Sequence, residues 1–133
     1  MKKILVIDDE PDARTLLSNR LSASGFQVVE AADGLSGVEA ARQGRPDLIL
    51  LDVLMPSQDG VETYHALRQD PATKTIPVIF LTALVQNILI TQKSLDLGGS
   101  YAILGKPYRC EELIREVRKA LGEPVGQGGE NPA

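Results

Sequence analysis

The chain has 133 residues, which suits one domain of ordinary size, and 43 % of them are hydrophobic, enough to form a core. No apolar run approaches the roughly 18 residues of a membrane span, and a single cysteine, Cys110, excludes an internal disulfide and suits a reducing cytoplasm. The net charge of −4, without a basic cluster, argues against nucleic-acid binding by this domain.

Short segments rich in Ile, Val and Leu recur along the chain, and segments with helical spacing lie between them. Near-continuous apolar runs are typical of strands buried on both faces of a parallel sheet. The expected strands are residues 3–7, 27–31, 48–51, 78–82 and 101–104. The apolar positions of the expected helices include Leu17 and Leu21, Val38 and Ala41, Val61 and Leu67, and Leu113, Val117 and Ala120. This alternation predicts an α/β fold with a doubly wound sheet and helices on both faces.

Two further segments complete this division of the chain. The segment between Thr82 and Lys106 is expected to contain the fourth helix, and it is unusually rich in apolar residues. Residues 123–133 are mostly Gly, Pro, Glu and Asn, which have almost nothing to bury. We therefore expect a folded domain over residues 1–122 and a disordered tail or linker over residues 123–133.

Polar side chains stand where the expected strands end. Asp8 and Asp9 follow the first strand, Asp52 follows the third, Thr82 ends the fourth, and Lys106 comes after the fifth. In open parallel sheets, ligands bind beyond the carboxyl ends of the strands, at the switch point in strand order. The sequence therefore predicts that carboxylates, a hydroxyl and an ammonium group converge at one edge.

Crowded carboxylates repel one another unless a cation joins them. Mg²⁺ binds oxygen ligands and keeps several waters, so one or two carboxylates are enough to hold it. The chain has no Cys/His cluster, which excludes a zinc site of the usual kind. With a cation bound, one aspartate could act as nucleophile toward a phosphoryl group and form an acyl phosphate.

The spacing of these residues resembles the receiver domain of two-component response regulators. The matching motifs are VIDDEP (residues 6–11), PDLILLDVLMP (46–56), DG (59–60), FLTA (80–83) and KP (106–107). Each motif alone is weak, but the five occur in order, each close to a strand end, from Lys2 to about Leu121. The resemblance implies a five-stranded, flavodoxin-like (βα)5 fold with strand order 2-1-3-4-5, which the chemotaxis regulators of this family share.

The resemblance also implies a role for each matching residue. Asp52 corresponds to the phosphoacceptor, and Asp9 and Asp52 to the carboxylate ligands of Mg²⁺. The backbone carbonyl of Leu54 would be a further ligand, and Asp8 would act mainly through a bound water. The residues implied to stabilise the phosphoryl group are Thr82, Ala83 and Lys106.

The switch residue of the family is an aromatic residue three positions before the lysine, where this chain has Ile103. Tyr101 lies two residues earlier, and the segment between Thr82 and Lys106 is about two residues longer than the family pattern. One interpretation places a bulge between Tyr101 and Lys106 that brings the tyrosine to the switch position. The other makes Ile103 the equivalent and assigns switching to the fourth helix. We favour the bulge, because Gly105 could absorb the extra length.

The implied partners are a histidine kinase or phosphotransfer protein and a downstream protein target or output domain. The resemblance also allows a homodimer through the fourth helix, fifth strand and fifth helix, and implies a cytoplasmic location without membrane contact. It implies no enzymatic activity beyond the Mg²⁺-dependent phosphorylation and dephosphorylation of the domain itself.

Three other functions use similar folds or residues, and the sequence can be compared with what each requires. A phosphohydrolase of the haloacid dehalogenase type would need a second aspartate where this chain has Leu54. A flavodoxin-like electron carrier would need a phosphate-binding loop after the first strand, where residues 8–12, DDEPD, would repel phosphate. A receiver-like module that binds partners without phosphorylation remains the main alternative.

Overall fold

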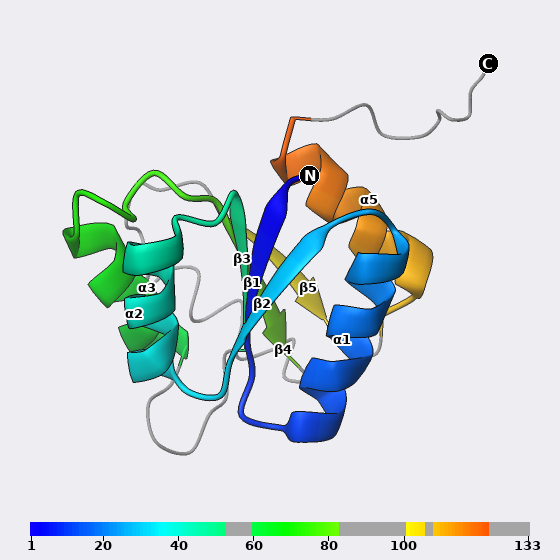
Figure 1. Cartoon of the computed structure of the whole chain (residues 1–133), viewed down its shortest axis with the longest axis horizontal. Coiled ribbons are helices and arrows are strands. Elements are labelled where there is room, and N and C mark those ends of the chain that lie inside the picture. The colour runs from blue at the N-terminus through cyan, green and yellow to red at the C-terminus, as the bar shows by residue number, and fades with distance from the viewer. Residues whose placement is uncertain (53–59, 83–100, 106–107, 123–133) are drawn as a thin grey trace.

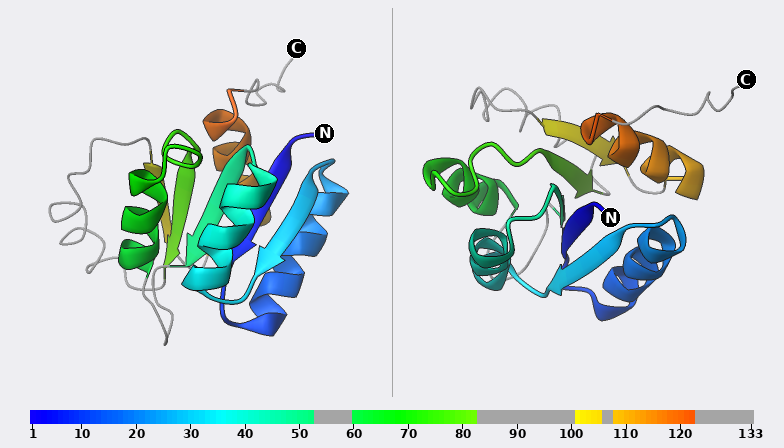
Figure 2. Two further views of the ribbon diagram at one scale, coloured as in Figure 1. Left: turned by 60° about the vertical axis from the view of Figure 1, so that its left-hand side comes forward. Right: turned by 45° about the horizontal axis from the view of Figure 1, so that its top comes forward.

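The computed structural model describes residues 1–52, 60–82, 101–105 and 108–122, which form a parallel β-sheet with helices on both faces (Figure 1, Figure 2). The strands are β1 (Lys3–Ile7), β2 (Gln27–Ala31), β3 (Leu48–Asp52), β4 (Val78–Thr82) and β5 (Tyr101–Gly105). The helices are α1 (Pro11–Ala23), α2 (Gly34–Gly44), α3 (Gly60–Gln69) and α5 (Cys110–Ala120).

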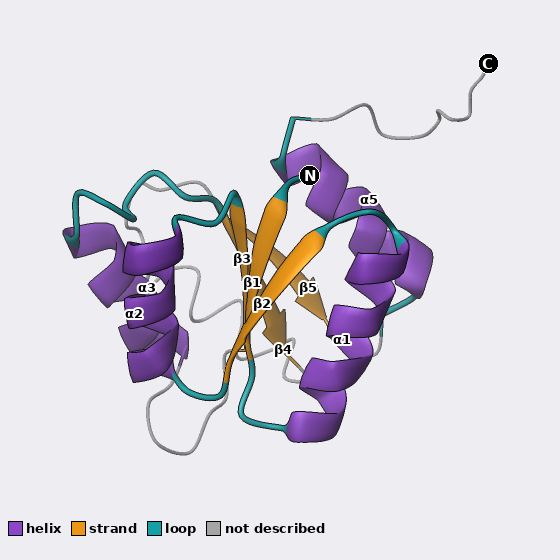
Figure 3. Cartoon of the chain, in the orientation of Figure 1, coloured by secondary structure: helices purple, strands orange, loops and turns teal. Residues whose placement is uncertain are grey.

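The strand order is β2-β1-β3-β4-β5, and each neighbouring pair is parallel (Figure 3). This confirms the predicted doubly wound sheet. The third and fifth strands each run one residue further than expected, to Asp52 and Gly105, because Asp52 pairs with Leu81 and Gly105 pairs with Thr82. The fourth helix and the tail were expected in residues that lie outside the described ranges.

Side chains alternate between the two faces of β1 and divide the core into two layers. Ile4 and Val6 pack with apolar residues of α1 and α5 on one face. Leu5 and Ile7 pack with apolar residues of α2 and α3 on the other. The helix residues in these layers include Leu17, Leu21, Ala41, Leu67, Leu113 and Val117, all of which are buried. β1 is therefore held from both sides, directly before the acidic residues that follow it.

The helix ends follow local sequence signals. α1 begins with Pro11 at a position where a missing N–H costs nothing. The N-cap of α2 is Asp33, whose Oδ1 accepts a hydrogen bond of 2.8 Å from the N–H of Ser36. Hydrogen bonding to the ionised side chain, first of all from the backbone of Ser36, lowers the pKa of Asp33. The C-cap of α2 is Arg45, which follows the last helical residue and adopts the left-handed conformation with φ of 46°.

The pairing of β4 with β5 bears on one expectation. Tyr101 pairs with Val78, Ile103 with Phe80 and Gly105 with Thr82, and the residues between them pair one to one. A bulge would leave one residue unpaired, so no bulge lies between Tyr101 and Gly105. The described part of β5 therefore gives no support to a bulge that would move Tyr101 toward the switch position; Lys106 lies outside the described residues, and the identity of the switch residue stays a prediction.

Within the residues that the structure describes, no helix is both long enough and apolar enough to cross a membrane.

Candidate functional site

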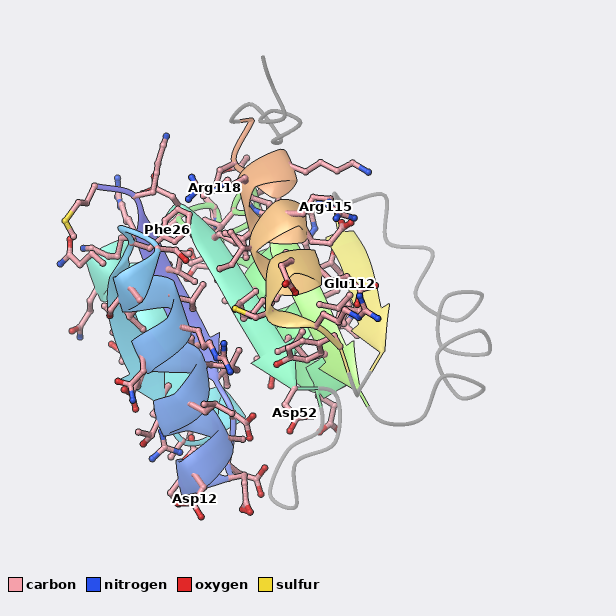
Figure 4. All side chains as sticks on the ribbon, turned by 90° about the vertical axis from the view of Figure 1, so that its right-hand side faces the viewer. Asp12, Phe26, Asp52, Glu112, Arg115 and Arg118 are labelled. Atoms are coloured by element: carbon pink, nitrogen blue, oxygen red, sulfur yellow. The ribbon has the colours of Figure 1, made fainter. Side chains whose placement is uncertain are left out.

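Three aspartates gather at the carboxyl edge of the sheet. Asp8 and Asp9 follow β1, and Asp52 is the last residue of the adjacent strand β3. Each offers a carboxylate oxygen, and these three oxygens lie within 4.8 Å of one another. Figure 4 shows Asp52 at the same edge as Asp12, near the start of α1. The structure therefore brings together the acidic residues that the sequence placed at the strand ends.

The carboxylates differ in their contact with solvent. Asp8 is 1 % exposed and Asp52 is 8 % exposed, whereas Asp9 is half-buried. Ionised side chains are costly to bury unless opposite charge or hydrogen bonds compensate them. Asp52 is thus shielded by β3 and its neighbours, and Asp9 is the most accessible member of the cluster.

Asp8 is fixed by several hydrogen bonds. Its backbone N–H donates to the carbonyl of Ala31 over 3.1 Å, which extends the pairing of β1 with β2. Its Oδ1 accepts from the backbone N–H of Glu10 over 2.9 Å, which forms the turn into α1. Its Oδ2 is buried and has no hydrogen-bond partner among the described residues. This oxygen is an acceptor that a cation or a cation-bound water would satisfy.

The donor set fits a hard divalent cation. Mg²⁺ selects oxygen ligands and is usually held through one or two carboxylates together with several waters. Three carboxylates with oxygens within 4.8 Å of one another, one of them carrying a buried oxygen without a hydrogen-bond partner among the described residues, supply both the ligands and the negative charge. Asp9 and Asp52 are the residues that would hold the ion directly, and Asp8 would act through water.

Tyr108 lies close enough to this cluster for the negative charges to change the pKa of its phenol. Burial raises the pKa of its phenol to about 12, and the negative charges of Asp8 and Asp52 contribute in the same direction. The ring also packs against the core layer between the sheet and α1 and α5. A neutral hydroxyl therefore borders the acidic edge at physiological pH.

The other predicted site residues are only partly described. Thr82 ends β4 one residue beyond the level of Asp52, so its backbone lies at the same edge of the sheet. Leu54, Ala83 and Lys106 lie outside the described residues. For the switch candidates Tyr101 and Ile103 the structure gives the strand register reported above.

Two residues at this edge were missed by the sequence reasoning. Arg14 donates from Nη1 to the backbone carbonyl of Asp8 over 2.7 Å, and Tyr108 lies within electrostatic reach of the cluster. The signal for Tyr108 was its place directly after the Lys-Pro motif. The signal for Arg14 was a cation one helical turn beyond three consecutive acids, a position from which it can reach back to the strand end.

Comparison with known proteins identifies the family. The family model described as the response regulator receiver domain matches residues 4–118. The chain therefore belongs to the receiver domain family of two-component response regulators, as the sequence motifs predicted.

Curated relatives fall into two kinds. The chain is 41 % identical over 121 residues to the DNA-binding dual master transcriptional regulator RpaA of Synechocystis, covering 91 % of this chain and 49 % of that protein. It is 30 % identical over 122 residues to the polar-differentiation response regulator DivK of Brucella anthropi, covering 92 % of this chain and 98 % of that protein. The chain thus spans about half the length of the first relative and nearly all of the second.

Solved structures agree with this assignment. The chemotaxis protein CheY4 of Vibrio cholerae superimposes with a TM-score of 0.80 at 30 % identity, covering 90 % of this chain and 98 % of that chain. The receiver domain of a sensor histidine kinase from Pseudomonas aeruginosa superimposes with a TM-score of 0.81 at 28 % identity, covering 92 % and 98 %. That structure was solved with a magnesium ion coordinated in its active site cleft.

Proposed function

We propose that this receiver domain takes a phosphoryl group onto Asp52 in the presence of Mg²⁺ and thereby changes its affinity for a downstream protein. The observation that carries the proposal is the cluster of Asp8, Asp9 and Asp52, whose carboxylate oxygens lie within 4.8 Å at the carboxyl edge of the sheet. The phosphodonor would be a phosphohistidine of a histidine kinase or of a phosphotransfer protein. The solved relative with magnesium in its cleft supports the choice of metal.

The chemical step is a phosphoryl transfer between two side chains. A carboxylate oxygen of Asp52 attacks the phosphorus, the P–N bond of the phosphohistidine breaks, and its electron pair remains on the imidazole nitrogen, which then takes a proton. When bound, Mg²⁺ supplies positive charge that offsets the charge on the phosphoryl oxygens.

The residues of the chain position this reaction. β3 holds Asp52 rigidly, because its neighbours Leu48 to Leu51 are fully buried. Asp9 and Asp52 would hold the cation directly, and Asp8 would hold it through a water. The family motifs add Thr82, whose hydroxyl would donate to a phosphoryl oxygen, Ala83, which would leave room for the group, and Lys106, which would pair with its charge. The domain would catalyse only its own phosphorylation and dephosphorylation.

The output of the reaction would be a shift between two conformations of the domain. We assign this shift to β4, β5, α5 and the fourth helix expected between β4 and β5. Because the ladder between β4 and β5 is uninterrupted, Ile103 is the residue paired with Phe80, two positions before the strand end. We therefore infer that the switch uses Ile103 and the helix-based route rather than a swing of Tyr101. A cytoplasmic location is proposed with this role.

The test is intact mass after incubation with a small phosphodonor such as acetyl phosphate, with and without Mg²⁺. One phosphoryl group should add about 80 Da to the wild type, as acyl phosphate formation requires, and only when Mg²⁺ is present. Asp52→Asn should abolish the addition. Asp12→Asn is the matched control, because Asp12 is an exposed aspartate at the same edge and should retain it. Phosphorylation of the Asp52→Asn variant at the wild-type level would contradict the assignment, and a wild type that accepts no phosphoryl group would favour a phosphorylation-independent binding module.

A further inference from the structure

Arg14 joins three parts of the fold near the acidic cluster. It stands on α1, its Nη1 donates to the backbone carbonyl of Asp8 over 2.7 Å, and its Nε donates to Oε1 of Glu30 on β2 over 3.1 Å. Only 18 % of the Arg14 side chain is exposed, against 41 % for Glu30. The guanidinium is planar and presents several donors in a fixed fork, so it can satisfy both acceptors at once.

The bond to the carbonyl of Asp8 fixes more than one atom. The peptide group is planar, so the orientation of the Asp8 carbonyl also sets the plane of the Asp8–Asp9 peptide. The N–H of Asp8 is already held by Ala31, and its Oδ1 by the N–H of Glu10. With its carbonyl held by Arg14 as well, Asp8 has hydrogen bonds at its N–H, its carbonyl and its side chain, which restrain the peptide that leads to Asp9.

The charge of Arg14 is offset by a neighbouring carboxylate, so we expect its effect on the cluster to be smaller than that of its hydrogen bond. Glu30 lies 3.1 Å from Nε, so the two residues form an ion pair. The field of an ion pair falls off faster with distance than the field of a single charge, and salt screens what remains at a partly exposed site. Geometry rather than charge is therefore the main contribution of Arg14.

We propose that Arg14 is a positioning residue for the Mg²⁺ site, because it locks the Asp8–Asp9 peptide through the carbonyl of Asp8 and so sets two of the three carboxylates before the ion arrives. The proposal rests on the proposed function, in which these carboxylates bind Mg²⁺. Groups that orient metal ligands from outside typically change metal affinity about 10- to 100-fold when they are removed.

The test measures Mg²⁺ binding itself by isothermal titration calorimetry, on the full chain, at a temperature where circular dichroism shows each variant folded. Arg14→Met should weaken Mg²⁺ binding at least about tenfold. Arg42→Met is the matched control, because Arg42 also contacts two carboxylates, Glu39 at 3.2 Å and Asp70 at 2.6 Å, but outside the cluster. Its Mg²⁺ affinity should stay within about twofold of the wild type.

Glu30→Gln separates geometry from charge. It removes one charge of the ion pair and keeps the bond from Arg14 to Asp8, so Mg²⁺ affinity should change less than about threefold, and less still at high salt. If Glu30→Gln weakens binding as much as Arg14→Met, charge carries the effect and the positioning role is overturned.

The remaining outcomes are also decisive. A wild type that binds no Mg²⁺ would remove the proposed function, whereas a wild type that binds Mg²⁺ while Arg14→Met binds it equally would remove only the role of Arg14, whatever the loss of stability. If Arg14→Met does not fold, Arg14→Gln takes its place with the same expected loss. If neither folds, Arg14 is a residue of the fold and the proposal is overturned.

Discussion

The close approach of α2 to β1 leads to a prediction about stability. Gly37 on α2 faces Ile7, and a Cβ at Gly37 would lie 2.5 Å from Cδ1, 2.8 Å from Cγ1 and 3.2 Å from Cγ2 of Ile7. Carbon atoms in good contact are about 3.5–4.0 Å apart, so the nearest pair falls about 1 Å short. Ile7 is fully buried, and it pairs with Ala31 and Leu51 on the two neighbouring strands.

Two effects compete in Gly37→Ala. Alanine in place of glycine inside a helix should stabilise the fold by about 1 kcal/mol. Overpacking a core typically costs about 1–3 kcal/mol, and rotation of Cδ1 relieves only the shortest contact, because Cγ1 and Cγ2 are both attached to the Cβ of Ile7. Because two of the three contacts cannot be relieved, we expect the upper half of the overpacking range, about 2–3 kcal/mol. After subtraction of the helix gain, the free energy of unfolding should fall by about 1–2 kcal/mol.

Urea unfolding followed by circular dichroism measures this change. Gly44→Ala is the control on the same helix, because a Cβ there meets only Nζ of Lys3 at 3.9 Å; without overpacking, its free energy of unfolding should equal that of the wild type or rise by up to about 1 kcal/mol. Ile7→Val removes Cδ1 and alone should cost about 0.5–1.5 kcal/mol. In the Gly37→Ala background this cost should vanish or reverse. A Gly37→Ala variant as stable as the wild type, or simple additivity of the two changes, would show that α2 does not pack against Ile7 this closely.

Two further predictions concern the edge of the sheet. Leu16 on α1 is 57 % exposed, and Leu16→Glu should impair phosphotransfer from a phosphorylated kinase while leaving phosphorylation by acetyl phosphate intact. Leu35→Glu on α2, where the leucine is 78 % exposed, is the control and should affect neither reaction. Loss of both reactions in the Leu16 variant would indicate damage to the fold instead. Burial raises the pKa of Tyr108 to about 12 from 10.0, which the difference in tyrosinate absorbance between wild type and Tyr108→Phe should show. Its contribution to stability should be present in full below pH 10 and be lost as pH rises toward 12, as urea unfolding of the two proteins across this pH range should show. Asp52→Asn should lower that pKa, since the charge of Asp52 contributes to the shift, and an unchanged midpoint would contradict the proximity of the two groups.

Most of the fold could be predicted because four of the five strands, all except the edge strand β2, are near-continuous apolar runs. Burial on both faces leaves little room for polar residues, so the runs at residues 3–7 and 48–51 are visible without any structure. The convergence of Asp8, Asp9 and Asp52 followed from the same pattern, since the carboxyl ends of parallel strands meet at one edge. These predictions depend only on local sequence and on the general geometry of parallel sheets.

The remaining features depend on contacts between residues that are distant in the chain. Counting residues between Thr82 and Lys106 could not tell whether the extra length lies inside β5 or before it, and only the pairing of Tyr101 with Val78 excluded the bulge. In the same way, the reach of Arg14 to Glu30 depends on how α1 lies across β1 and β2. Neither Tyr101 nor Arg14 lies in a sequence pattern that identifies the residue it contacts.

The packing around β1 predicts that displacements in either layer of the core change the positions of the acidic residues that follow this strand. Alternation sends Val6 toward α1 and α5 and sends Ile7 toward α2 and α3. The next residue, Asp8, is then held by Arg14 from the α1 layer, while Ile7 faces Gly37 of α2, where the structure leaves no room for a Cβ. A close-packed interior transmits a displacement rather than absorbing it. Repacking of either layer should therefore move the carboxylates of Asp8 and Asp9, which follow β1 directly.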